Sequence, residues 1–351
     1  MPKLFLLGTT GYIGGDALYA LYEAHPDWEY TCVVRGTDKG SLIAAQYPKI
    51  RLVYGDLDSI DLLTKEAANA DVVVNWASAD HSAAAAALID GLSKRTANEP
   101  GYYIHTSGTG VLCFDDLARK TFGESSTKVY DDWDSIGEVT SLPIEAPHRP
   151  TDKVVLDGQA AHAEKVKTAI VCPPTIYDQG RGPVNQRSIQ LPELSRVTIE
   201  QGNGVQVGAG KTIWTQVNVH DLSDLYLLLI EAAVQGGGNA TWGPEGYYFS
   251  ENGEFLWADV AKEVAHEAHR QGLIKEDKIV SYAPEDVSKL HPYGPVVWGA
   301  NSRGKAIRAR KLLGWNPKDR SLLQTVSGAV DIEAKKKGLK PGHAAKAAGT
   351  A

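Results

Sequence analysis

Short apolar runs alternate with longer segments of helical periodicity along the first half of the chain. Runs that are apolar throughout are typical of strands buried on both faces of a parallel sheet, and Leu4–Leu7 is the first of them. Five further strands are predicted at Tyr30–Val34, Ile50–Tyr54, Val72–Asn75, Tyr102–Thr106 and Thr168–Cys172. This alternation predicts an α/β fold with a doubly wound parallel sheet, covered by helices on both faces.

The turn after the first strand carries three glycines at the spacing GxxGxxG. Gly8 permits a tight exit from the strand, Gly11 lets the backbone approach phosphates, and Gly14 lets the next helix pack close to the sheet. The N-terminus of that helix offers free N–H groups and a positive dipole end to an anion. A ligand-free glycine turn is the alternative, but the position and the following strands favour a Rossmann-type dinucleotide site. The cofactor-binding residues expected here are Gly8, Thr10, Gly11, Tyr12, Ile13 and Gly14.

The tip of the second strand is where such folds distinguish NADP from NAD. A basic residue there accepts the 2′-phosphate of NADP, whereas an acidic one binds the free ribose hydroxyl of NAD. Arg35 stands at this tip with Lys39 nearby, so NADP is favoured; Asp38 keeps NAD as the alternative.

Polar residues also follow the third, fourth and fifth predicted strands. Carboxyl ends of parallel strands line the ligand crevice, so Asp56, the segment Asn75-Trp76-Ala77-Ser78 and Ser107 are expected to lie along it. Asp56 has a second interpretation as the N-cap of the next helix. A hydroxyl such as that of Ser107 can polarise a substrate carbonyl.

Several motifs in order along residues 3 to 320 make the chain resemble the extended short-chain dehydrogenase/reductase superfamily, the relatives of NAD-dependent sugar epimerases/dehydratases and of dihydroflavonol and cinnamoyl-CoA reductases. The resemblance implies that Asp56 contacts adenine, that Ala77 lines the nicotinamide ribose pocket, and that Ser107 is the catalytic serine. It also implies that the backbone of Pro174 and Thr175 faces the nicotinamide. Leu57 and Thr106 complete the expected cofactor set. The motifs are the early GxxGxxG, Gly55-Asp56-Leu57, Thr106-Ser107-Gly108, Cys172-Pro173-Pro174-Thr175-Ile176-Tyr177, Val217-Asn218-Val219-His220-Asp221, Asn301-Ser302-Arg303 and Leu313-Gly314-Trp315-Asn316-Pro317.

The YxxxK pair on which the family's chemistry depends is absent from this sequence. The alignment places His148 at the tyrosine position and Asp152 at the lysine position. An imidazole titrates near neutrality, so His148 is the candidate acid/base, with Asp152 at i+4 as its candidate orienting carboxylate. Pro150 opposes this pairing, because proline fits a helix's first turn and would leave His148 in the loop before it. A surface or capping histidine is the alternative, and Lys153 is a second candidate for the ribose hydroxyls.

The substrate side differs from that of the nucleotide-sugar enzymes. Where those relatives commonly carry a phosphate-clamping arginine, this chain has Trp214. An indole removes the charge and offers a flat apolar surface, which disfavours a nucleotide sugar and favours an apolar or aromatic carbonyl or alcohol. Tyr177 and Asn185 are expected in the same substrate-binding lobe.

The composition excludes several classes of partner. A net charge of -7 and a pI near 5.8 leave no basic footprint for nucleic acid or an anionic membrane. The three cysteines, Cys32, Cys113 and Cys172, are too scattered for a disulfide framework or a zinc site, and no metal is expected. With no signal-peptide pattern and no apolar run of about 18 residues, a cytoplasmic location is expected.

We expect a Rossmann core at residues 1–173, a mixed region with the smaller C-terminal substrate-binding lobe at 174–333, and a disordered, lysine-rich tail at 334–351. Segments at 214–250 are expected to return to the core sheet. The predicted function is an NAD(P)-dependent oxidoreductase acting on a small-molecule carbonyl or alcohol, as a monomer or homodimer. A catalytically altered NADP-binding sensor or scaffold, and a redox-neutral isomerase or lyase, are the alternatives.

Overall fold

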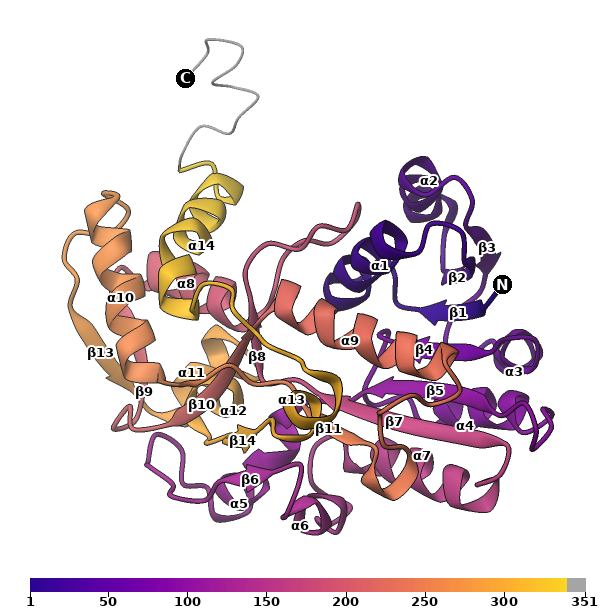
Figure 1. Cartoon of the computed structure of the whole chain (residues 1–351). Helices are drawn as coiled ribbons and strands as arrows, with labels where there is room; N and C mark the ends of the chain where they lie inside the picture. Colours follow the sequence, from indigo (N-terminus) through magenta and orange to yellow (C-terminus); the bar gives the residue numbers. More distant parts are fainter. Residues whose placement is uncertain (340–351) are drawn as a thin grey trace.

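A seven-stranded sheet with every strand parallel to its neighbours crosses the molecule (Figure 1). The computed structural model describes residues 1–339. The strand order is β11-β7-β5-β4-β1-β2-β3, which confirms the doubly wound α/β class, and each strand predicted above begins and ends within two residues of an observed one. The strands are β1 (Lys3–Leu7), β2 (Glu29–Val34), β3 (Arg51–Tyr54), β4 (Val72–Asn75), β5 (Gly101–Thr106), β7 (Val166–Cys172) and β11 (Tyr247–Phe249).

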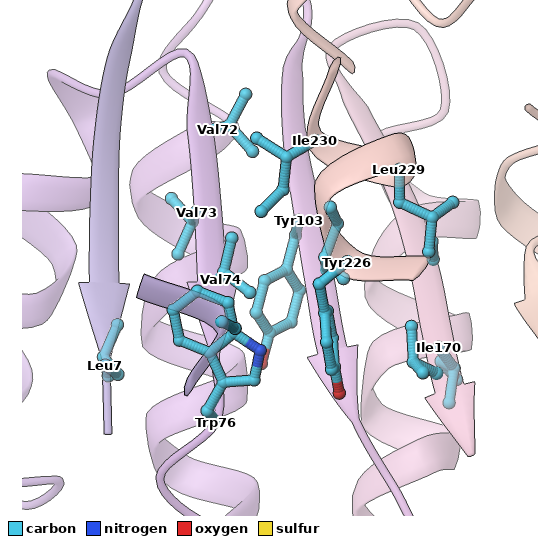
Figure 2. Close-up of a cluster of buried hydrophobic side chains, with 14 of the residues drawn as sticks. Leu7, Val72, Val73, Val74, Trp76, Tyr103, Ile170, Tyr226, Leu229 and Ile230 are labelled. Carbon is cyan, nitrogen blue, oxygen red and sulfur yellow. The ribbon is translucent and has the colours of Figure 1, made fainter. Parts of the chain in front are cut away.

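Helices cover both faces of this sheet. On one face α1 (Tyr12–Ala24) packs against α9 (Val219–Val234), and on the other α4 (Ser82–Leu92) packs between α3 (Ile60–Ala68) and α7 (Arg149–Ala161). The run of alanines in α4 lets it lie close to its neighbours, because small side chains shorten the distance between helix axes. Figure 2 shows part of this core, in which Tyr226 and Ile230 of α9 lie beside the valines of β4.

A second lobe with its own core follows β7. Its small sheets join β12, β10 and β8, and β13 with β9. Three helices, α8, α10 and α14, pack against one another and bury tryptophans that include Trp214, Trp257 and Trp298. The elements of this lobe are β8 (Thr175–Tyr177), α8 (Gln190–Gln201), β9 (Gly204–Val207), β10 (Ile213–Asn218), β12 (Glu254–Leu256), α10 (Trp257–Arg270), β13 (Ile279–Tyr282), α11 (Pro284–Leu290), α12 (Gly294–Gly299) and α14 (Leu322–Lys336).

The chain passes between the two lobes more than once. After β8 and α8 it returns as α9 and β11, and β11 pairs with β7 at the edge of the main sheet. β11 lies within the segments at 214–250 that were expected to return to the core sheet. The remaining elements are α2 (Thr37–Gln46), η1 (Thr109–Cys113), α5 (Phe114–Arg119), β6 (Tyr130–Asp131), α6 (Ile136–Thr140), η2 (Gly243–Glu245), β14 (Gly304–Lys305) and α13 (Arg308–Leu313).

The C-terminal helix corrects one boundary. The disordered tail was expected from Ala334, but α14 continues to Lys336 because Ala334 is buried in the core of the second lobe. Residues 340–351 lie outside the described part of the chain. Within residues 1–339, no helix combines the length and the apolar character needed to cross a membrane.

Candidate functional site

The glycine turn after β1 forms a cradle in which Gly8 and Gly14 leave no room for a larger residue. Gly8 has φ +88°, and a Cβ atom on it would lie 2.5 Å from the backbone nitrogen of Ala77. A Cβ atom on Gly14 would lie 2.4 Å from the carbonyl oxygen of Gly8. No side chain caps the N-terminus of α1, which begins at Tyr12, so the first N–H groups of this helix have no acceptor within it. The turn therefore presents unpaired donors at the positive end of a helix dipole.

A cavity of about 400 Å³ opens beside this cradle. Arg35 and Lys39 line this cavity. Within residues 1–339, neither side chain has an ion-pair partner. Two cations without carboxylate partners, next to free helix N–H groups, match the charge of a dinucleotide's phosphates. Asp56 also lines the cavity, and a hydrogen bond from Ser59 lowers the pKa of its carboxyl. Seven of the predicted cofactor residues line this cavity: Gly8, Thr10, Gly11, Arg35, Asp56, Leu57 and Ala77.

The other predicted cofactor residues do not line the cavity. The Tyr12 hydroxyl donates to the carbonyl of Asp178 at 2.8 Å, which ties the loop after β8 to the start of α1. Thr106 is turned toward α9, where its hydroxyl lies 2.6 Å from that of Tyr226. Pro174 and Thr175 are buried, and the Thr175 hydroxyl has no hydrogen-bond partner. The remaining two are Ile13, which packs on the core, and Gly14, described above.

His148 lies over the loop that follows β5. It is the N-cap of α7, with φ +64°, and its Nε2 atom would be 3.1 Å from a Cβ atom on either Gly108 or Gly110. These two glycines leave room for the imidazole. The Nδ1 atom of His148 donates to Asp80 at 2.8 Å, and this hydrogen bond lowers the pKa of Asp80.

Asp152 does not orient His148, contrary to the expected pairing. The i+4 relation holds for the backbone, where the Asp152 N–H donates to the carbonyl of His148. The left-handed conformation at the N-cap turns the His148 side chain outward, whereas Asp152 points from the first turn of α7 into the sheet. Pro150 stands in that first turn, as the alternative interpretation required. The carboxylate that holds His148 is Asp80, in the segment after β4.

Asp152 instead forms a buried cluster with Ser107. The Ser107 hydroxyl lies 3.0 Å from Asp152 Oδ2, and the hydroxyl of Tyr247 on β11 lies 3.2 Å from the same oxygen. The other oxygen, Oδ1, has no hydrogen-bond partner and lies 3.9 Å from Nε2 of His105. Burial raises the pKa of Asp152 to about 6 and lowers the pKa of His105 to about 4. At neutral pH His105 is therefore uncharged and does not stabilise the carboxylate.

Two expected substrate residues are buried rather than exposed to a ligand. Trp214 is 4% exposed, and its indole N–H donates to the carbonyl of Ala300 within the core of the second lobe. Tyr177 is 0% exposed and donates to the carbonyl of Arg320. Both were expected near the substrate because the resemblance to the family places them there, but their aromatic side chains pack into the core of the second lobe. Asn185 is exposed and lines a separate hollow of about 630 Å³ between the loop after β8 and α14.

Arginines near this hollow are already paired with carboxylates. Arg187 binds Glu333 and Glu193, and Arg320 binds Asp178. No phosphate clamp replaces the missing family arginine at position 214. Sequence analysis missed Asp80 and Tyr247 because little in the sequence marks them. Asp80 is an isolated acidic residue beyond β4, and Tyr247 lies more than 90 residues from its partner Asp152. Within residues 1–339, no group of three or more metal-ligating side chains is present.

The glycine cradle at the carboxyl edge of a seven-stranded parallel sheet defines a dinucleotide-binding fold of the Rossmann class. The chain matches no profile of a known protein family. It is 40% identical over 344 residues to the oxidase ucsJ of an Acremonium species, a match that covers 96% of this chain and 99% of the relative. The chain therefore belongs to the same family as this oxidase, and its fold is that of the NAD-dependent epimerase/dehydratase branch of the extended short-chain dehydrogenase/reductase superfamily.

Solved structures of that branch share the fold. A dTDP-glucose 4,6-dehydratase from Bacillus anthracis, in complex with NAD, superposes with a TM-score of 0.65 at 15% identity, covering 97% of this chain and 100% of its own. A UDP-glucuronic acid 4-epimerase from Bacillus cereus, in complex with UDP-glucuronic acid and NAD, gives 0.64 at 14% identity, covering 95% and 99%. An uncharacterized protein of Saccharomyces cerevisiae is 24% identical over 336 residues, covering 92% of this chain and 97% of its own.

Proposed function

We propose that the protein is an NADP-dependent oxidoreductase that exchanges hydride between its cofactor and an apolar or aromatic alcohol/carbonyl pair. The observation that carries the proposal is the cavity beside the glycine cradle, where Arg35 and Lys39 stand without carboxylate partners. In NAD-binding folds this position meets a ribose hydroxyl, for which an acidic residue is suited. Two unpaired cations instead suit the 2′-phosphate of NADP.

The residues of the chain have separate roles in this reaction. The glycine cradle and the start of α1 bind the pyrophosphate, and Asp56 lies where the adenosine half binds. Ser107, at the end of β5, forms a hydrogen bond to the reacting oxygen, while His148, held by Asp80, exchanges the proton. The nicotinamide supplies the hydride acceptor or donor when it is bound.

The ion pairs that Arg187 and Arg320 form with carboxylates support a substrate without a diphosphate. A nucleotide sugar needs free cations for its phosphates, whereas Arg187 and Arg320 are committed to carboxylates and Trp214 is buried. The 40% identical relative is named an oxidase, which supports the direction from alcohol to carbonyl.

The test is hydride transfer with a matched cofactor comparison. Purified protein is incubated with NADP⁺ or NAD⁺ and a panel of apolar and aromatic alcohols, and nicotinamide absorbance is followed. We expect reduction of NADP⁺ in preference to NAD⁺. In the double variant Arg35→Ala/Lys39→Ala, NADP⁺ should bind at least about tenfold more weakly, since a charge-assisted hydrogen bond contributes about 1.5–3 kcal/mol. NAD⁺ binding should be unchanged. Lys262→Ala/Lys289→Ala, which removes two exposed lysines from α10 and α11, serves as the charge-matched control.

Three results would contradict the proposal. Equal loss of NADP⁺ and NAD⁺ affinity in the double variant would assign the two cations a general role. Tight cofactor binding without turnover of any alcohol or carbonyl would favour a sensor or scaffold. A converted substrate without net change in the cofactor would favour an isomerase or lyase.

A further inference from the structure

Ser107 has one hydroxyl proton and two neighbours that compete for it. Asp152 Oδ2 lies 3.0 Å from Ser107 Oγ inside the protein, and the proposed function gives the same hydroxyl a second neighbour, the reacting oxygen. An ionised carboxylate can only accept hydrogen bonds, so it would take the Ser107 proton for itself. Ser107 could then offer the reacting oxygen only a lone pair, and a carbonyl would gain nothing from it.

A protonated Asp152 reverses the polarity of this contact. A carboxylic acid carries one O–H, which at the same 3.0 Å separation can donate to Ser107 Oγ. The Ser107 proton is then free to point toward the reacting oxygen. The hydroxyl of Tyr247 remains in place as a donor to the carboxyl group.

The surroundings of Asp152 raise the share of this neutral form, although a pKa of about 6 leaves most of the carboxyl ionised at pH 7 in the ligand-free protein. The groups that face it are His105 and Tyr103 from β5, Tyr247 from β11, and Cys172 from β7. Burial raises the pKa of Tyr103, Tyr247 and Cys172 and lowers that of His105, so all four are uncharged at neutral pH.

The charged neighbours on α7 itself act in the opposite direction, because His148 and Arg149 both lower the pKa of Asp152. Two nitrogens of the Arg149 guanidinium donate to the carbonyls of Leu142 and Thr140, and His148 is bound to Asp80. Burial of Asp152 raises its pKa to about 6 despite the hydrogen bonds from Ser107 and Tyr247. An anionic dinucleotide bound nearby would disfavour the charged form further.

We propose that Asp152 serves this site as a neutral carboxylic acid, donating to Ser107 and so directing the Ser107 proton to the reacting oxygen. This inference rests on the proposed function. Asp152 is a positioning residue, because it acts through Ser107 and does not touch the substrate. Its position explains how a carboxyl group can stand where the family has a lysine.

The decisive variant is Asp152→Asn, which keeps the shape and supplies a permanent N–H donor. We expect this variant to retain hydride transfer within about threefold. In the unmodified enzyme the rate should fall as pH rises through the pKa of Asp152, because the acid ionises. The variant should not show this fall, because an amide does not ionise in this range. Asp152→Leu, which has no donor, should lose about 100-fold in kcat with little change in KM for NADP⁺, as expected when one preorganised hydrogen bond to the reacting oxygen is lost.

A second measurement uses no substrate. Infrared difference spectra of the ligand-free protein against Asp152→Asn should show a carboxyl that titrates near pH 6. Its midpoint should rise by about one pH unit in Ser107→Ala, because the lost hydrogen bond stabilised the ionised form. Thr109→Val, which removes a hydroxyl without a partner from the same loop, should leave the midpoint unchanged.

Two outcomes would overturn the proposal. One is a loss of about 100-fold in Asp152→Asn that remains folded by thermal unfolding, which would mean that the negative charge is needed. The other is a midpoint below about pH 5 in the ligand-free protein that stays there when NADP⁺ is added. Failure of hydride transfer with every substrate would overturn the proposed function instead, and the infrared titration would still decide the state of Asp152.

Discussion

The backbone of His148 is held at φ +64°, a conformation that few residues other than glycine and asparagine adopt readily. A side chain in this conformation at an N-cap points away from its helix, which is why Asp80 and not Asp152 binds the imidazole. Strain of this kind persists only where the surrounding structure holds it, and it concentrates at functional sites.

Two substitutions separate the chemistry of His148 from its backbone strain. His148→Asn retains the left-handed conformation without an imidazole, whereas His148→Ala adds about 1–2 kcal/mol of backbone strain. Both should slow hydride transfer by about 100-fold, because general acid–base catalysis contributes about 10²–10⁴. Only the alanine variant should lower the midpoint of thermal unfolding. Full activity in His148→Asn would exclude the imidazole as the proton-exchanging group.

Single residues were where the sequence was least able to predict the site. The glycines and the cations after β2 follow local rules of turn and phosphate binding, and the structure brings Gly8, Gly11, Arg35 and Lys39 together around one cavity. Trp214, Tyr247 and Asp80 depend on contacts between segments far apart in the chain, and no local pattern reports such contacts. Pro150 was an exception, since a proline near a helix start carries its own geometric rule.

At the scale of elements, the geometry of the strand-turn-helix unit β1–α1 depends on close backbone contacts at its glycines. The backbone of Ala77 lies so close to Gly8, and the Gly8 carbonyl so close to Gly14, that neither glycine has room for a Cβ atom. Closeness of this order also brings the N-terminus of α1 to the cavity.

Gly14→Ala tests this dependence directly. Its Cβ atom would lie 2.4 Å from the Gly8 carbonyl oxygen, so the turn must shift, at a cost of about 1–3 kcal/mol for overpacking. We expect lower thermal stability and a loss of NADP⁺ binding by isothermal calorimetry. Gly36→Ala is the matched control, because nothing lies within 4 Å of its Cβ position and its φ of -150° suits any residue. Unchanged binding in Gly14→Ala would show that the cradle tolerates a shift.

Strands of the main sheet were predictable because they are buried on both faces and read as continuous apolar runs. The second lobe was less accessible. Its strands β8 and β12 have three residues each, as does β11 at the edge of the main sheet, and such strands are too short to show a period. The pairing of all three depends on the return of the chain between the lobes.

For the molecule as a whole, two buried carboxyls govern stability near neutrality. Burial raises the pKa of both Asp152 and Asp132 to about 6, above their unfolded value of 3.8. Their contribution to stability is fully present below pH 3.8 and is lost as pH rises through about 6. Glu267 on α10 acts oppositely: hydrogen bonds led by that from Arg270 lower its pKa to about 2, so its contribution is lost only as pH falls toward that value.

The expected result is a free energy of unfolding that decreases between pH 5 and pH 7 by about 1.4 kcal/mol for each carboxyl, because this range covers about one unit of the pKa shift. Thermal unfolding of the ligand-free protein across this range measures it. In Asp152→Asn the decrease of the free energy of unfolding with pH should be roughly half as steep, because Asp132 remains. A slope equal in the two proteins would mean that Asp152 has an ordinary pKa when folded.

The position of β11 has a consequence for how the chain comes to be folded. Tyr247–Phe249 forms the last strand of the sheet that starts at Lys3, so the sheet stays unfinished until nearly 250 residues have left the ribosome. Until then β7 is an uncovered edge, and uncovered edges invite pairing with other chains. A fragment ending at residue 173, although it contains the whole glycine cradle, would carry that edge permanently and should aggregate rather than fold as an independent domain.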